Sequence, residues 1–290
     1  MENQSVLSKY KRQPKIYLTL PSGGNWYKNN PLEKTGSGEL PIYSMTAKDE
    51  LMIKTPDALM NGESTVEVIK SCCPLLDDPW GMPVIDLDAI LIAIRIATYG
   101  EKMEMTIPIR FTENGQTKVE SETIEVDLRE LLDGMQGKTW QSSFQYNELT
   151  FHLRPLTYKE STGFFMSTFE NQRLAQILQN DKVDDAKKME AFKEGFKKLS
   201  QMTLDMIVSH ITSIETPEGS ESDKNAIREF FNSTDKDTFV AVQDALEQIR
   251  KKWEIPPKKF QVPQEYVEKG APKTIDVPMV FDNSNFFVSK

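Results

Sequence analysis

The chain contains little from which a redox or metal site could be built. Its 290 residues include two cysteines and two histidines, and the cysteines, Cys72 and Cys73, are adjacent. Two neighbouring cysteines form neither a disulfide framework nor a zinc site by themselves. His152 and His210 lie in no HExxH pattern and in no Cys/His spacing typical of a metal centre. The sequence therefore predicts no metal and no cofactor.

Long apolar runs are also missing. The longest, residues 89–97, falls short of the ~20 residues that span a bilayer and is interrupted by Arg95. The first twelve residues are polar and lack the apolar segment of a signal peptide, which predicts synthesis and residence in a cytoplasm. No P-loop, GxGxxG or GxSxG pattern occurs, so the enzyme classes that these motifs define are not indicated.

Positive charge is in deficit. The chain has 35 Lys+Arg against 44 Asp+Glu, a net charge of −9. Sequence-independent binding of nucleic acid depends on clustered Lys and Arg against phosphates, so we expect no nucleic-acid partner. The short basic clusters at residues 251–253 and 258–260 are interpreted as solvated segments of an acidic protein.

The first half of the chain mixes helix and strand signals. Strands are expected over residues 15–20 and 39–45, and helices over residues 47–54, 64–72 and 87–99. Thr46 and Asp49 have capping-box spacing, and Asp86 is expected to cap the third helix. Alternating apolar residues at 103–111, 124–128 and 149–153 predict three strands of one small antiparallel sheet. These elements form a predicted domain over residues 1–157.

The helix over residues 87–99 is apolar on nearly every face, which is typical of a helix buried in a core or interface. Arg95 is the exception within it. Charged side chains are rarely buried without a partner, so we expect Arg95 to pair with a carboxylate or to reach solvent along its aliphatic stem. We also consider Arg95 a candidate partner-binding residue.

The second half of the chain is predicted to be helical. From Asp184 onwards, residues 189, 192, 196, 199, 203, 206 and 210 follow a 3,4 spacing, and residues 239, 242, 246, 249 and 253 repeat it. Two such faces joined by a short helix predict an antiparallel helical bundle over residues 158–255. The expected fold class is therefore α+β: an N-terminal mixed helix and small-sheet domain, a C-terminal bundle, and an extended tail over residues 256–290.

The tail alternates apolar residues and ends with two aromatic residues. It could add a strand to the sheet edge of a partner or fold back on its own sheet, and the sequence leaves both alternatives open. The candidate partner-binding residues in the tail are Ile275, Val277, Met279, Phe281, Phe286 and Phe287.

Carboxylate pairs are the main candidates for chemistry. Asp86 and Asp88, and likewise Asp184 and Asp185, stand at helix starts, where the exposed N–H groups and the helix dipole favour negative charge. Capping therefore explains both pairs without catalysis. A metal-dependent hydrolase that combines Asp86 and Asp88 with His152 is a remote alternative, and it requires these side chains to converge around a cleft. His152 is otherwise expected to be a solvated cross-strand neighbour and His210 a hydrogen-bonded core residue.

Four sequence blocks stand in a fixed order: residues 20–24 (LPSGG) with Trp26-Tyr27, residues 45–51 (MTAKDEL), residues 55–62 (TPDALMNG), and residues 86–91 (DLDAIL) leading to residues 93–100 (AIRIATYG). As an ordered set, these blocks resemble the baseplate hub and hub-assembly proteins of T-even-like contractile-tailed bacteriophages. Residues 211–219, Ile227, Phe230 and residues 280–287 are similar as well. In that family some members carry Cys-x-x-Cys pairs of a zinc ribbon. The corresponding stretches here, residues 106–117 and 262–280, contain neither cysteine nor histidine, so we expect no structural zinc.

The resemblance implies a non-enzymatic role in the central part of a phage tail baseplate. It implies a location in the virion after synthesis in the host cytoplasm. The implied partners are other baseplate or hub proteins, with a second copy of the chain as a further possibility. An alternative of the same origin is an assembly chaperone that binds hub subunits and is absent from the mature virion.

Overall fold

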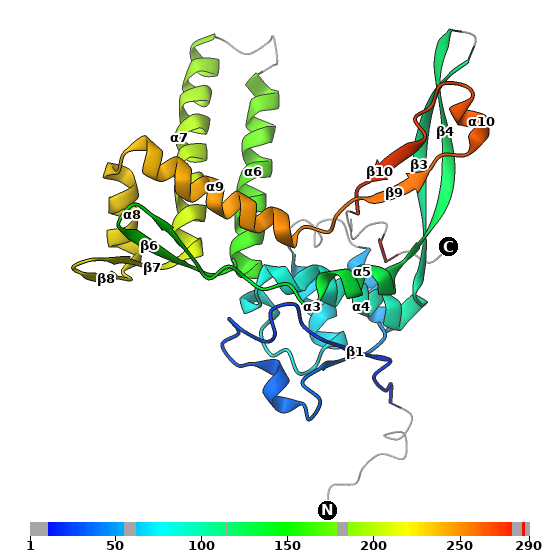
Figure 1. Ribbon diagram of the computed structural model, residues 1–290, viewed down its shortest axis with the longest axis horizontal. Coiled ribbons are helices and arrows are strands. Elements are labelled where there is room, and N and C mark those ends of the chain that lie inside the picture. The colour runs from blue at the N-terminus through cyan, green and yellow to red at the C-terminus, as the bar shows by residue number, and fades with distance from the viewer. Residues whose placement is uncertain (1–10, 55–61, 114, 179–184, 280–285, 288–290) are drawn as a thin grey trace, which may run out of the picture.

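The computed structural model describes residues 11–54, 62–113, 115–178, 185–279 and 286–287. Helices and small antiparallel sheets share the chain, which confirms the α+β fold class. The buried apolar side chains form three clusters. The largest surrounds the central helix of the first half, the second joins a four-stranded sheet to the helices of the second half, and the third joins two long hairpins (Figure 1).

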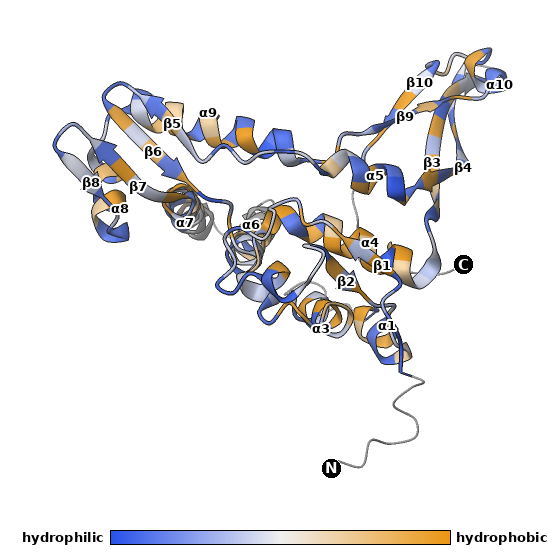
Figure 2. Cartoon of the chain, turned by 60° about the horizontal axis from the view of Figure 1, so that its bottom comes forward, coloured by the Kyte–Doolittle hydropathy of each residue, from blue (hydrophilic) through white to orange (hydrophobic). Residues whose placement is uncertain are grey.

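The largest cluster is built around α4 (Leu87–Tyr99). All residues from 89 to 97 are buried, as the apolar pattern predicts, and the helix is mostly orange in Figure 2. The elements grouped with it are β1 (Ile16–Leu18), η2 (Pro31–Lys34), β2 (Leu40–Ile42), α1 (Ala47–Ile53), α3 (Glu63–Cys72), η3 (Pro79–Gly81), η4 (Val84–Asp86) and α5 (Leu128–Met135).

Local signals set the helix starts of this region. Thr46 caps α1 through the predicted capping box: its backbone N–H donates to Asp49 Oδ2 at 2.7 Å, and its Oγ1 accepts from the Asp49 backbone N–H at 3.2 Å. Gly62 precedes α3 with φ of +80°, a conformation that glycine adopts without strain. A Cβ at this position would lie 2.9 Å from Tyr158 Oη, so space as well as backbone geometry favours glycine there.

The predicted three-stranded sheet is wrong in its third strand. β3 (Lys102–Glu113) pairs with β4 (Gln116–Asp127) in a long hairpin, but β6 (Leu149–Leu153) does not join them. β6 instead lies between β5 (Ser143–Tyr146) and β7 (Ile211–Thr216), and β8 (Gly219–Glu221) completes a four-stranded sheet. Alternation identifies a half-buried strand, whereas its partner is chosen by the apolar face that it meets, here Ile211 and Ile214 of β7.

The antiparallel bundle expected over residues 158–255 is not confirmed. α6 (Tyr158–Leu178) and α7 (Asp185–His210) project side by side as a helical hairpin (Figure 1). The predicted first residue of this second helix, Asp184, lies outside the described residues. α8 (Lys224–Ser233) and α9 (Lys236–Trp253) pack at the base of the hairpin, where Ile207 and Val208 of α7 share a core with Val242 and Ile249 of α9. Farther out, the apolar face of α7 is exposed.

The tail folds back on its own chain. β9 (Lys258–Gln261) pairs with β10 (Thr274–Val277), with α10 (Gln264–Val267) between them, and this unit lies against the β3–β4 hairpin (Figure 1). Ile109 and Phe111 of β3 pack there against Val262 and Tyr266. The division of the chain at residues 157 and 256 stays a prediction, and the four-stranded sheet pairs strands from both sides of the first boundary.

Candidate functional site

Asp86 has a different role from the predicted helix cap. Its carboxyl group is completely buried, and it accepts no hydrogen bond from the first turn of α4. Oδ1 accepts from the Ser22 backbone N–H at 2.7 Å, and Oδ2 accepts from Ser22 Oγ at 2.5 Å and from Tyr27 Oη at 2.8 Å. The Asp86 carboxylate therefore accepts its hydrogen bonds from residues that follow β1, and not from the N–H groups of α4. This network joins the first and last of the four sequence blocks.

The environment of Asp86 perturbs its titration. Burial raises the pKa of Asp86 to about 6, while the hydrogen bonds from Ser22 and Tyr27 oppose this rise. Burial, with the neighbouring carboxylate, also raises the pKa of Tyr27 well above its ordinary value. A perturbed carboxyl group is a frequent catalytic feature, but this one has no surface open to a substrate. Asp86 thus has a structural role: its buried hydrogen bonds link Ser22 and Tyr27 to the start of α4.

The residues proposed for a hydrolase do not converge. His152 lies on the outer face of the four-stranded sheet, with Nε2 3.2 Å from Glu215 Oε2 on β7, as expected of a cross-strand neighbour. Asp86 bonds instead with Ser22 and Tyr27. No group of three potential metal ligands occurs among the described residues. The arrangement required by the remote alternative is therefore not formed in this part of the chain.

His210 is the hydrogen-bonded histidine that the sequence predicts. Its Nδ1 lies 2.9 Å from the carbonyl oxygen of Arg154, so Nδ1 donates its proton and Nε2 is left as the acceptor. Burial lowers the pKa of His210, which favours the neutral ring. His210 therefore joins the end of α7 to the residue that follows β6.

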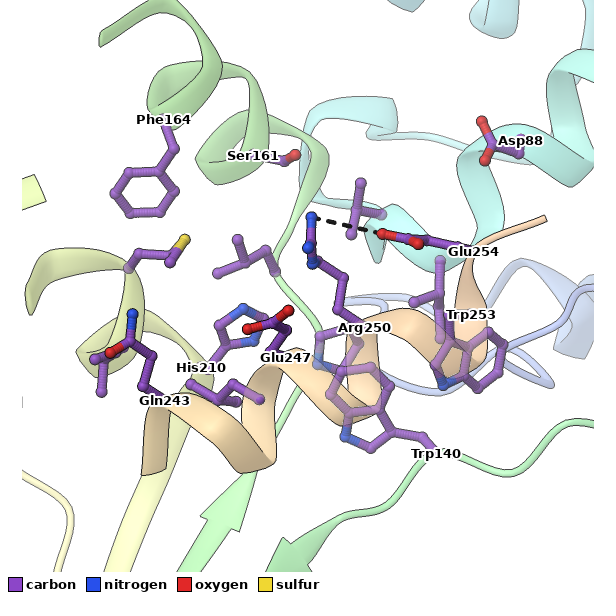
Figure 3. A pocket seen from close by; sticks show the side chains of 17 residues that line it. Asp88, Trp140, Ser161, Phe164, His210, Gln243, Glu247, Arg250, Trp253 and Glu254 are labelled. Atoms are coloured by element: carbon purple, nitrogen blue, oxygen red, sulfur yellow. Dashed lines mark ion pairs between the residues drawn. The ribbon is translucent and has the colours of Figure 1, made fainter. Parts of the chain in front are cut away.

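A cleft of about 610 Å³ lies beside His210, between η4, α6, α7 and α9 (Figure 3). Its walls are largely apolar and aromatic, formed by Trp140, Phe164, Met206, Leu246 and Trp253 among others. Asp88, Glu247 and Arg250 supply polar groups, and Arg250 pairs with Glu254 at 3.5 Å. Sequence reasoning missed this cleft because its lining comes from distant segments. The lining is suited to holding an apolar group.

Arg95 is buried without the expected carboxylate. Only 6% of the residue is exposed, so it does not reach solvent, and its guanidinium lies over the rings of Tyr99 at 5.1 Å and Phe286 at 5.5 Å. Within the described parts of the chain, Nε and Nη1 have no hydrogen-bond partner and no carboxylate pairs with the group. Burial lowers the pKa of Arg95. The guanidinium of Arg95, expected from the sequence to form an ion pair or to reach water, thus lies against the rings of Tyr99 and Phe286.

The remaining candidate partner-binding residues lie inside the chain. Val277, Met279, Phe286 and Phe287 are buried in the cluster around α4, and Ile275 is half-buried against it. Tyr99 Oη donates to the carbonyl oxygen of Phe287 at 3.1 Å. Phe281 lies outside the described residues. The structure therefore shows the tail docked on its own chain, and a partner-binding role for these side chains stays a prediction.

Exposed apolar side chains gather elsewhere, on the α6–α7 hairpin. Of the twelve large apolar residues that are exposed in the described chain, seven belong to these two helices, and their exposed fractions lie between 36% and 65%. We call them the hairpin stripe: Phe165, Phe169, Met189, Phe192, Phe196, Leu199 and Met206. The 3,4 spacing of α7 revealed an apolar face in the sequence, but not that this face is open.

Asp86, His152 and His210 each make contacts with other residues of the chain, and the hairpin stripe is exposed. No helix in the described part of the chain is long and apolar enough to cross a membrane. Residues 13–259 match the family model described as T4 bacteriophage base plate protein. The match covers most of the chain, so the protein belongs to this family, and the resemblance of the four sequence blocks is confirmed. Comparisons with curated proteins and with solved structures returned no match.

Membership of this family gives the chain a structural role in a phage tail baseplate. The matched residues include β1, α4, both hairpin helices and α9, whereas β10 and Phe286-Phe287 lie beyond them. The family relationship therefore covers the Asp86 network and the hairpin stripe. It does not cover the docked end of the tail.

Proposed function

We propose that the protein is a non-enzymatic component of the baseplate hub that binds other baseplate subunits during or after tail assembly. The observation that carries this proposal is the concentration of exposed apolar side chains on the α6–α7 hairpin. Single exposed apolar residues are normal on a soluble protein, whereas a contiguous set is typical of an interaction surface. A structural baseplate protein needs such surfaces because it binds neighbouring subunits.

The arrangement of acids and bases supports binding rather than catalysis. Asp86 is buried and accepts three hydrogen bonds, His210 is committed to the Arg154 carbonyl, and His152 is paired with Glu215 on an open sheet face. A catalytic site requires such groups to converge on one reacting atom. The acidic net charge of −9 also supports protein partners over nucleic acid.

Particle composition tests the proposal. Virions would be purified, washed at high salt and analysed by quantitative mass spectrometry alongside the infected-cell lysate. We expect the polypeptide in the virion at a fixed ratio to known baseplate subunits. Its absence from virions, with abundant protein in the lysate, would overturn a retained hub component and favour the assembly-chaperone alternative.

A further inference from the structure

The apolar face of α7 has the spacing of a coiled-coil seam. Met189, Phe192, Phe196 and Leu199 continue through residue 203 to Met206, with alternating steps of three and four residues. Such spacing places side chains along one side of a helix, where the knobs of a second helix fit between them. A flat apolar sheet or a lipid surface does not require this regular pattern. The geometry of the stripe thus favours a helical occupant.

The exposed residues of α6 extend the same face. Thr168 of α6 faces Met202 of α7, with Oγ1 3.7 Å from Sδ. Phe165 and Phe169 are rotated from Thr168 in the same angular sense as Leu199 and Met206 are rotated from Met202. Because the two helices run antiparallel, an equal sense of rotation places both sets on one side of the hairpin. The hairpin stripe is therefore one surface formed by two helices.

The base of this surface is already partly covered by a helix of the same chain. Met206 lines the cleft together with Leu246 and Gln243 of α9 (Gln243 is labelled in Figure 3). Ile207 shares a core with Val242 and Ile249. α9 carries its own apolar residues at 3,4 spacing. This contact shows that an amphipathic helix fits against the end of α7. Beyond Met206 the same face is left open.

The charge beside the open face indicates the chemistry of the occupant. Lys193 and Lys197 are exposed, four residues apart on α7, and each follows a phenylalanine of the stripe. Neither lysine has an ion pair among the described residues, whereas Lys198, on the other flank, pairs with Glu170 of α6 at 2.9 Å. In coiled coils, charges that flank the apolar seam select partners of opposite sign. The lysine row therefore favours a helix with acidic flanks.

The same row disfavours a second copy of this chain. α6 occupies one flank of α7, so two copies that paired their α7 helices through the stripe would bring the lysine flanks together. In that symmetric arrangement Lys193 and Lys197 would face the same row of the other copy. Like charges across a seam oppose association. An acidic partner helix has no such penalty.

We propose that the hairpin stripe binds an amphipathic helix of another baseplate protein, one with apolar residues at 3,4 spacing and Asp or Glu beside them. The identity of the partner as a baseplate protein rests on the proposed function, whereas the helical, acidic-flanked character rests on the stripe itself. The stripe would form the seam, and the lysine row would pair with the acidic flank.

Site-specific photocrosslinking in infected cells tests this proposal with the full-length chain. p-Benzoylphenylalanine would replace Leu199 in the stripe and, as the matched control, Gln201, which is exposed on the opposite face of α7. Crosslinked peptides would be mapped by mass spectrometry. We expect adducts at position 199 on a 3,4-spaced, acidic-flanked segment of another baseplate protein, with at least about tenfold fewer at position 201. Adducts on the chain itself, on lipid, or equally at both positions would overturn the proposal.

Substitutions then separate the apolar and charge contributions to the adduct at position 199. Phe192→Glu is expected to lower its yield at least about tenfold, because it places a charged side chain at the centre of the apolar contact. Lys193→Glu combined with Lys197→Glu should lower it several-fold, while Glu194→Gln on the opposite face should not. An unchanged yield in the double lysine variant would reject the acidic flank. Melting curves check that each exposed substitution leaves the fold intact.

The outcome is distinguishable from a failure of the proposed function. If the protein is absent from virions yet position 199 crosslinks to an acidic-flanked helix of a baseplate protein in the lysate, the stripe binds its helix during assembly only. If the protein is present in virions but position 199 gives no preferential adduct, the stripe proposal fails and the structural role stands on other surfaces.

Discussion

Replacing Asp86 with asparagine tests whether one buried carboxyl group makes the stability of this protein depend on pH. The group is completely buried and accepts from Ser22 N, Ser22 Oγ and Tyr27 Oη. In Asp86→Asn, the amide oxygen can still accept from Ser22 N, while the amide nitrogen donates to a hydroxyl that turns to accept it. The variant therefore mimics the protonated acid at every pH. It removes the titration and keeps the shape.

The sign and size of the effect follow from the pKa. Burial raises the pKa of Asp86 from 3.8 to about 6, so between these values the folded protein holds a proton that the unfolded chain has released. The stabilisation from this group is fully present below pH 3.8 and is lost as the pH rises through about 6. A shift of roughly two units corresponds to about 3 kcal/mol. Relative to the wild type, Asp86→Asn should become more stable as the pH rises, by up to that amount.

Urea unfolding followed by tryptophan fluorescence, at intervals from pH 4.5 to 7.5, measures this difference. The free energies of unfolding of wild type and Asp86→Asn are expected to diverge as the pH rises from the acid end of this range to about 6, and to differ by a constant amount above it. Asp86→Ala serves as the control, because it leaves the donors of Ser22 and Tyr27 without an acceptor, and it should be destabilised by roughly 1–3 kcal/mol for each donor at any pH. Parallel pH profiles for wild type and Asp86→Asn between pH 4.5 and about 6 would refute the reasoning.

Substitutions at three further positions probe the core. Arg95→Met should leave the melting temperature unchanged or higher, because it removes two buried N–H groups that lack partners in the described chain. Arg95→Lys loses the stacking on the aromatic rings and should melt at a lower temperature than the wild type and Arg95→Met. The opposite order of melting temperatures would contradict this account. Phe287→Ala should lower the free energy of unfolding by roughly 3–5 kcal/mol in urea titration if the tail is docked on its own chain, and a loss below 1 kcal/mol would argue against that docking. Gly62→Ala should destabilise by more than about 1 kcal/mol because of the positive φ and the close Tyr158 hydroxyl, whereas Gly134→Ala, in helix α5 with open space at its Cβ, should not.

Most local structure could be predicted from the sequence because its causes are local. Thr46 and Asp49 sit three residues apart and form the capping box that their spacing requires. The apolar run of α4 leaves no polar face to expose, so burial follows from composition alone. β6 marks the limit of this reasoning. Its alternation identified a strand, but its neighbours are residues 143–146 and 211–216, and no property of Leu149, Phe151 or Leu153 specifies those partners.

The site was harder to predict because it depends on contacts between distant segments. Asp86 precedes a helix, as a capping residue does, yet Ser22 and Tyr27 offer three donors in a dry environment and outcompete the helix N–H groups. Arg95 was expected to form an ion pair. Its guanidinium instead lies over the rings of Tyr99, on its own helix, and of Phe286, which is distant in the sequence. In both cases a rule for single elements was overridden by tertiary geometry.

The hairpin stripe shows what apolar spacing does and does not establish. α7 and α9 carry the same 3,4 pattern, and the pattern alone predicted that both faces are buried. In the isolated chain, Val242 and Ile249 of α9 are buried while Phe192 and Phe196 of α7 are not. Periodicity identifies the apolar face of a helix, whose burial is favourable. It does not identify the molecule that buries this face. For a member of a baseplate family, the cover need not come from the same chain. If the hairpin stripe binds its partner as proposed, an outside helix takes the place along α7 that α9 fills at its base.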